Sequence, residues 1–129
     1  MQLTFEDDLP IDVWLDPDTP EWRWLARTWD ALAAEVAQSG ARFALVLFPL
    51  SYQMDPAYPF LPQEPFLAYC AERGFACLDL LPPLRAAAAQ TPVWIDDWHP
   101  APRGHEVAAA SIARFLADAG LLPDPARGP

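Results

Sequence analysis

An uninterrupted apolar run at residues 43–48, Phe-Ala-Leu-Val-Leu-Phe, is the feature that most constrains how this 129-residue chain folds. A strand with one face in water alternates apolar and polar residues, whereas a strand covered on both faces is apolar throughout. Pro49 follows directly and ends the run, because proline supplies no N–H to a sheet ladder. The run therefore predicts a strand of a parallel sheet that has helices on both faces.

A second apolar segment predicts the neighbour of this strand. Residues 76–80, Ala-Cys-Leu-Asp-Leu, follow Gly74 and a short helical segment that begins at Pro65. Strand, helix and strand in this order form a right-handed crossover unit with parallel strands. Residues 11–15 alternate as an edge strand does, although flanking prolines limit its pairing. We expect an α/β fold with two or three strands, whose open sheet edges favour a homodimer or a partner chain.

Helix signals precede the first strand. Thr19, Pro20 and Glu21 supply a hydroxyl cap, a proline at the first helical position and an acid in the first turn. The helix is expected to end at Gly40, and Trp24 falls off its apolar stripe and should be exposed. The residues of the expected core stripe are Trp22, Leu25, Trp29, Leu32 and Val36.

Two more helices are predicted after the second strand. The alanine run at residues 86–89 indicates a short helix, and a longer one should begin near Pro102 and end at Gly120. Between the strands and these helices, the Pro- and Tyr-containing loop 51–64 either walls a substrate cleft or simply covers the core. The inner stripe expected for the last helix is Ala108, Ile112, Phe115, Leu116 and Ala119.

Composition restricts the class of partner. The chain is 53% hydrophobic and has a net charge of -10, which fits one globular domain that repels nucleic acid and anionic membranes. No apolar run approaches the about 20 residues of a spanning helix, and the acidic N-terminus is unlike a signal peptide. We expect a cytoplasmic protein with an acidic segment at 1–18, one domain at 19–120 and a flexible tail at 121–129. Cys70 and Cys77 are expected to be free core thiols.

The stretch at residues 94–105, Trp-Ile-Asp-Asp-Trp-His-Pro-Ala-Pro-Arg-Gly-His, concentrates the acid/base side chains of the chain. Asp96 and His99 are three residues apart in a turn stiffened by Pro100. An aspartate that binds one histidine nitrogen fixes the tautomer, so that the other nitrogen can accept a proton from a nucleophile. The same spacing also fits a helix cap beside a surface histidine.

The run Asp96-x-x-His99-Pro100-x-x-x-Gly104-His105, with the helix after it, resembles the last block of the SGNH (GDSL-type) ester hydrolases. The resemblance is specific at residues 96–116 and looser back to residue 21, about the C-terminal half of a family domain. It implies a three-layer, flavodoxin-like sandwich fragment. It further implies that Asp96 is the orienting acid and His99 the general base in hydrolysis of a small-molecule carboxylic or acetyl ester.

The N-terminal Gly-Asp-Ser nucleophile block and the oxyanion blocks of that family are absent. Of the three serines, only Ser51 follows a predicted strand, so it is the candidate nucleophile within this chain, although its turn lacks the glycines of a nucleophile elbow. The alternative to an enzyme is an inactive SGNH-like remnant that acts as a binding or interaction module. The sequence is compatible both with an enzyme that uses Ser51 and with an inactive remnant.

A metal site is the second chemical interpretation of the same stretch. Its ligands would be Asp96, Asp97, His99 and His105. No helical H-E-x-x-H pair is present, and the prolines stiffen the gap between the histidines. We therefore expect neither a metal nor a cofactor.

Overall fold

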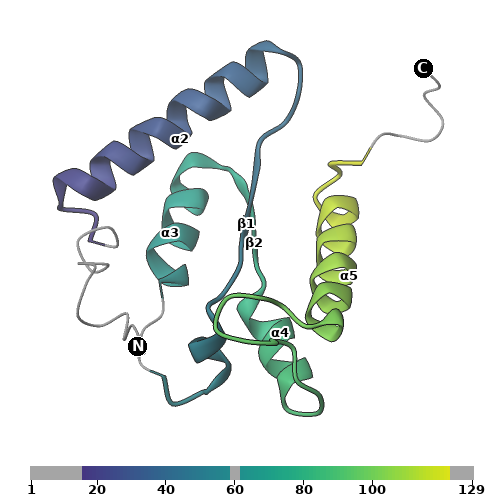
Figure 1. The fold of residues 1–129 in the computed structure, drawn as a ribbon. Helices are drawn as coiled ribbons and strands as arrows, with labels where there is room; N and C mark the ends of the chain where they lie inside the picture. Colours follow the sequence, from purple (N-terminus) through teal and green to yellow (C-terminus); the bar gives the residue numbers. More distant parts are fainter. Residues whose placement is uncertain (1–15, 59–61, 123–129) are drawn as a thin grey trace.

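The computed structural model describes residues 16–58 and 62–122. The expected edge strand at 11–15 and most of the expected tail lie outside these residues. Two parallel strands and several helices confirm the α/β class (Figure 1). In chain order the elements are α2 (Pro20–Gln38), β1 (Ala44–Leu47), the 3-10 helix η1 (Ser51–Met54), α3 (Gln63–Arg73), β2 (Ala76–Asp79), α4 (Leu81–Ala88) and α5 (Pro102–Asp118).

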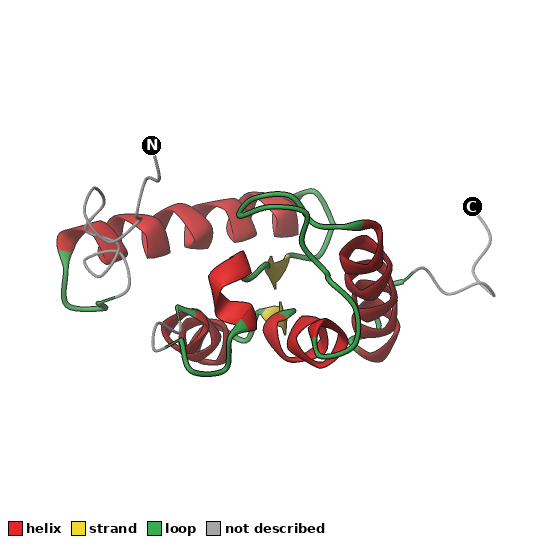
Figure 2. Ribbon diagram, turned by 60° about the horizontal axis from the view of Figure 1, so that its bottom comes forward, coloured by secondary structure: helices red, strands yellow, loops and turns green. Residues whose placement is uncertain are grey.

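β1 and β2 pair in parallel, as the two apolar runs predict, in a register that matches Ala44 with Ala76 and Leu47 with Asp79. Successive strand residues point to opposite faces. The Cys77 thiol contacts Cys70 of α3, whereas Leu78 packs on the cluster that contains Ala108 of α5. Helices α3 and α5 therefore cover opposite faces of the sheet, with the strands between them (Figure 2).

The main core cluster lies where α4 and α5 meet the end of the sheet. Its buried members are Leu80, Leu84, Val93 and Ala108, and Val46 and Leu78 pack against them. All eight strand residues are nevertheless only half-buried. The apolar runs predicted strands covered on both faces, and the difference arises because, in the described part, each strand has one open edge.

α2 begins as predicted, since the Thr19 hydroxyl accepts a hydrogen bond from the N–H of Trp22 at 3.3 Å. Trp22 is buried and packs on Phe66 of α3, with ring centroids 5.3 Å apart. Trp24 is exposed, as expected. Leu32 was expected on the core stripe but is 48% exposed, because the described contacts of α2 with α3 involve the other side of that stripe.

Polar contacts also hold α2 and α3 together. The Tyr69 hydroxyl donates to Asp30 Oδ1 at 2.6 Å, and Arg73 forms an ion pair with the same carboxylate at 2.9 Å. The Arg73 guanidinium and the Tyr69 hydroxyl hold the pKa of Asp30 below its usual value. Sequence periodicity indicates the apolar stripe of α2 but not these polar contacts.

The segment after β1 contains the short helix η1, which the sequence interpretation treated as loop. Gln53 and Gln63 are buried and exchange two amide hydrogen bonds of 2.9 and 3.1 Å. Arg85 of α4 donates to the carbonyl oxygen of Gln53. These bonds fix η1 between the start of α3 and the C-terminal half of α4.

The last helix starts at Pro102 as predicted, with Ala108 buried on its inner side. Ala119 was expected on this inner stripe but is exposed. It follows the last residue of α5 and lines an open pocket, so the inner stripe ends before it. No helix within residues 16–58 and 62–122 is both long and apolar enough to cross a membrane.

Candidate active site

The segment between α4 and α5 is closed into a narrow loop by backbone hydrogen bonds. Trp94 and Pro100 form an antiparallel bridge, and the N–H of Ile95 donates to the carbonyl of His99 at 2.8 Å. The N–H of Ala101 donates to the carbonyl of Val93 at 2.9 Å. The five residues 95–99 are therefore held at the tip of a small hairpin.

Asp96 organises the tip of this hairpin. Its Oδ1 accepts hydrogen bonds from the backbone N–H groups of Trp98 and His99, both at 2.8 Å. The Trp98 N–H, the His99 side chain and the His99 N–H lower the pKa of Asp96. The carboxylate is thus held ionised and oriented by the backbone before any ligand arrives.

The same carboxylate binds the imidazole of His99. Nδ1 of His99 lies 2.8 Å from Oδ2 and 2.9 Å from Oδ1 of Asp96. Because an ionised carboxylate can only accept, Nδ1 carries the hydrogen, and in a neutral imidazole the lone pair is then on Nε2. The His99 side chain is 73% exposed, so this basic nitrogen is open to an incoming group.

Tyr52 of η1 ties the hairpin to the end of the sheet. Its hydroxyl lies beside the carboxylate of Asp97, and its ring stacks on Tyr58 with centroids 6.2 Å apart. Burial and the neighbouring Asp97 raise the pKa of Tyr52. The sequence interpretation noted Tyr52 only as part of the loop wall, since the spacing along the chain carries no signal for a contact 45 residues away.

Ser51, the candidate nucleophile, is not hydrogen-bonded to His99. Its hydroxyl oxygen is buried and has no hydrogen-bond partner among residues 16–58 and 62–122. Ser39 donates to the carbonyl of Val36, and Ser111 lies on α5, where it lines a pocket beside β2. The structure thus brings Asp96 and His99 together, and none of the three serines is hydrogen-bonded to His99 within the described residues.

The metal interpretation finds no support in the arrangement. Asp97 is engaged by Tyr52, and Asp96 by His99 and two backbone N–H groups. His105 is exposed in the first turn of α5. Across the described residues, no group of three or more His, Cys, Asp or Glu side chains could hold a metal ion.

Gly104 is the residue that the sequence motif marks without assigning a role. It is buried in the first turn of α5, directly against the backbone of Val93. This close approach sets the start of the helix against the base of the hairpin. Its role is therefore to position the Asp96–His99 hairpin on α5.

Neither the protein-family models, nor the curated proteins, nor the solved structures include a match to this chain.

Proposed function

We propose that this domain is an ester hydrolase of the SGNH type, or the C-terminal part of one, with Asp96 and His99 as its acid/base pair. The observation that carries the proposal is the 2.8 Å contact of His99 Nδ1 with Asp96 Oδ2, with an exposed ring beyond it. A carboxylate, an imidazole and an open second nitrogen are the parts that a general base requires. The three-layer SGNH sandwich is part of this proposal.

The roles follow from the hydrogen bonds. Nε2 of His99 takes the proton of a hydroxyl as that hydroxyl attacks the ester carbonyl carbon. Asp96 stabilises the imidazolium that forms, and the imidazolium then returns the proton to the leaving alkoxide. The backbone N–H groups on Asp96 keep it ionised through this cycle, since they favour its charged form.

We propose that the attacking hydroxyl comes from outside residues 1–129. All three serines lie in the described residues, and none is bonded to His99. A buried Ser51 hydroxyl cannot meet a substrate without a rearrangement of η1. We therefore propose a nucleophile outside residues 1–129, either elsewhere on the same polypeptide or on a second one, with water as the slow substitute when the domain is alone.

The test compares the two histidines of the chain. Hydrolysis of p-nitrophenyl acetate is measured for the purified chain and for its His99→Ala, Asp96→Asn, Ser51→Ala and His105→Ala variants. We expect His99→Ala to lower the rate by about tenfold or more, within the range of general base catalysis. Asp96→Asn should lower it less, and Ser51→Ala and His105→Ala should leave it unchanged.

Equal rates for His99→Ala and His105→Ala would show that the Asp96 contact confers no special reactivity, and would overturn the proposal. Loss of activity in Ser51→Ala would instead place the nucleophile within this chain. His105 is a matched control because it is exposed and has no carboxylate partner among the described contacts.

A second candidate function is a non-catalytic interaction module. The observation that favours it is that no serine is hydrogen-bonded to His99 among the described residues, together with the open edges of their two-stranded sheet. An unreactive His99 in a folded chain would favour this candidate.

A further inference from the structure

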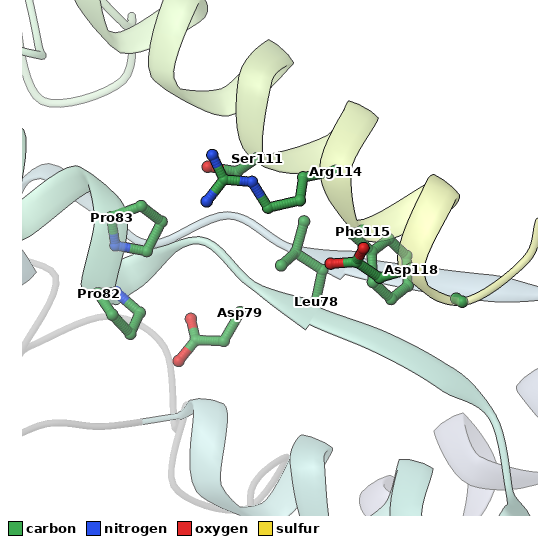
Figure 3. Close-up of a pocket in the computed structure, with 9 residues that line it drawn as sticks. Leu78, Asp79, Pro82, Pro83, Ser111, Arg114, Phe115 and Asp118 are labelled. Carbon is green, nitrogen blue, oxygen red and sulfur yellow. The ribbon is translucent and has the colours of Figure 1, made fainter.

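A pocket of about 390 Å³ lies on the opposite side of β2 from β1 and is walled by α5 (Figure 3). Its lining combines apolar and charged side chains, as the close-up shows. The residues that matter here are Leu78, Asp79, Pro82, Arg114, Phe115 and Asp118. The Asp96–His99 pair is not among them, so this is a separate surface.

The lining places the pocket at the open edge of β2. Leu78 and Asp79 are consecutive strand residues, so their side chains point to opposite faces of the sheet. A pocket on one face would be lined by only one of them. A pocket lined by both must lie along the edge of the strand, and the sheet order leaves that edge of β2 unpaired among the described strands.

Backbone hydrogen-bonding groups point out of this edge. Leu80 donates its N–H to the carbonyl of Leu47, so even-numbered residues of β2 use their backbone groups toward β1. In a parallel ladder the alternate residues point the other way. The N–H and C=O groups of Cys77 and Asp79 therefore face the pocket side, and no backbone partner for them is present in residues 16–58 and 62–122.

The charged side chains that line the pocket have few partners among the described residues. Asp79 uses its carboxylate for one hydrogen bond, to the N–H of Leu81 at 2.8 Å. Arg114 and Asp118 take part in no ion pair of the described residues. The pocket thus combines an open strand edge, an apolar wall at Phe115, two carboxylates and the guanidinium of Arg114, so carboxylates outnumber cations in its lining.

We propose that this groove, formed by the open edge of β2 and the facing side of α5, binds an extended basic segment of a partner polypeptide by strand addition. The added strand places one side chain toward α5, where Leu78 and Phe115 favour an apolar residue. Its neighbour points to the other face, beside Asp79, where a Lys or Arg is favoured. The recognised pattern is an alternation of apolar and basic residues.

A second copy of this chain is the less suitable occupant. Each chain carries a net charge of -10, so two copies repel each other, whereas a basic segment is attracted. The proposal is independent of ester hydrolysis, since it uses neither Asp96 nor His99.

The experiment is fluorescence anisotropy with a fluorescein-labelled heptapeptide of alternating valine and lysine. Its two comparison probes are the same peptide with glutamate in place of lysine, and the lysine peptide N-methylated at alternate amides. We expect saturable binding of the lysine peptide and none of the glutamate peptide. N-methylation should weaken binding about tenfold or more, because it removes backbone hydrogen bonds and keeps the charge.

Protein variants locate the site. Asp79→Asn keeps the acceptor for the Leu81 N–H and removes the charge. Asp118→Asn removes the corresponding charge on α5. Each should weaken the lysine peptide severalfold, whereas the charge-matched control Glu35→Gln on α2 should not. Equal binding of the N-methylated peptide, or equal effects of Glu35→Gln and Asp79→Asn, would overturn the proposal. So would sedimentation that shows a stable dimer which Asp79→Asn and Asp118→Asn strengthen, because a second copy would then occupy the edge.

Discussion

The backbone carbonyl of Val93 occupies the space that a β-carbon on Gly104 would need. The same carbonyl accepts the hydrogen bond from Ala101 that closes the base of the 95–99 hairpin. The first turn of α5 is therefore seated on the strand-like segment before the hairpin, and only glycine permits this approach. The glycine five residues after His99 is explained by packing that positions the Asp96–His99 hairpin.

Gly104→Ala should destabilise the fold, although alanine is the better helix former. Helix propensity favours alanine by about 1 kcal/mol, whereas overpacking against a fixed backbone carbonyl costs about 1–3 kcal/mol. The cost of overpacking exceeds the gain in helix propensity because the carbonyl of Val93 is held in place by the hydrogen bond from the Ala101 N–H.

Urea unfolding measures the change in the free energy of unfolding. Arg103→Ala, which removes only an exposed ion pair with Glu106, is the control and should change stability by less than about 0.5 kcal/mol. A more stable Gly104→Ala variant would contradict the close approach.

The pH dependence of the hairpin follows from Asp96. Its pKa is lowered in the fold, first by the Trp98 N–H and then by His99. The ionised carboxylate therefore stabilises the hairpin at pH values above about 3.9, its unfolded pKa, and this contribution is lost as the pH falls through the lowered folded value. Carbon-detected NMR titration of the Asp96 carboxyl should give a midpoint below the usual range.

His99→Ala separates the two causes of this shift. Because the backbone donors remain in that variant, the Asp96 pKa should rise only part of the way to its usual value. A complete return in His99→Ala would show that the imidazole, and not the backbone, dominates.

The elements that the sequence predicted correctly are those with a local cause. Thr19 and Pro20 start α2, and the apolar runs around Val46 and Leu78 become the two parallel strands. The pairing of Asp96 with His99 is also local, since three residues and a proline turn bring the side chains together. Each of these depends on a few neighbouring residues.

The features that the sequence did not predict depend on contacts between distant segments. The Tyr52–Asp97 contact, the Gln53–Gln63 pair and the Val93–Gly104 approach join different elements. Their residue types are ordinary on a surface or in a loop, so no periodicity or composition marks them. Leu32 fits the helical stripe and is still exposed, because periodicity gives a face and not what covers it.

The exposure of Leu32 and the burial of Trp22 lead to a paired prediction. Trp22 is 6% exposed between α2 and α3, so Trp22→Ala should lower the free energy of unfolding by about 3–5 kcal/mol. Leu32→Ala on the same helix removes a side chain that is 48% exposed and should cost less than about 1 kcal/mol. Denaturant unfolding followed by far-UV circular dichroism compares the two. A larger loss for Leu32→Ala would mean that α2 contacts its surroundings through the other side of its stripe.

The two cysteines should be inert in the folded protein despite being neighbours. Their thiols are in contact between α3 and β2, and burial raises the pKa of Cys70 and raises that of Cys77 to about 12. Since only the thiolate reacts, labelling by iodoacetamide at pH 8 should be much slower in buffer than in urea.

The sign of the pH effect on stability follows from the same shift. Unfolded thiols ionise near pH 8.5 while the folded ones stay neutral, so their contribution is complete below that pH and is lost as the pH rises toward 12. Cys77→Ala should flatten the decline of stability between these pH values relative to the parent chain. Rapid native labelling of Cys77, at a rate equal to that in urea, would show that the thiol lies outside the contact between α3 and β2.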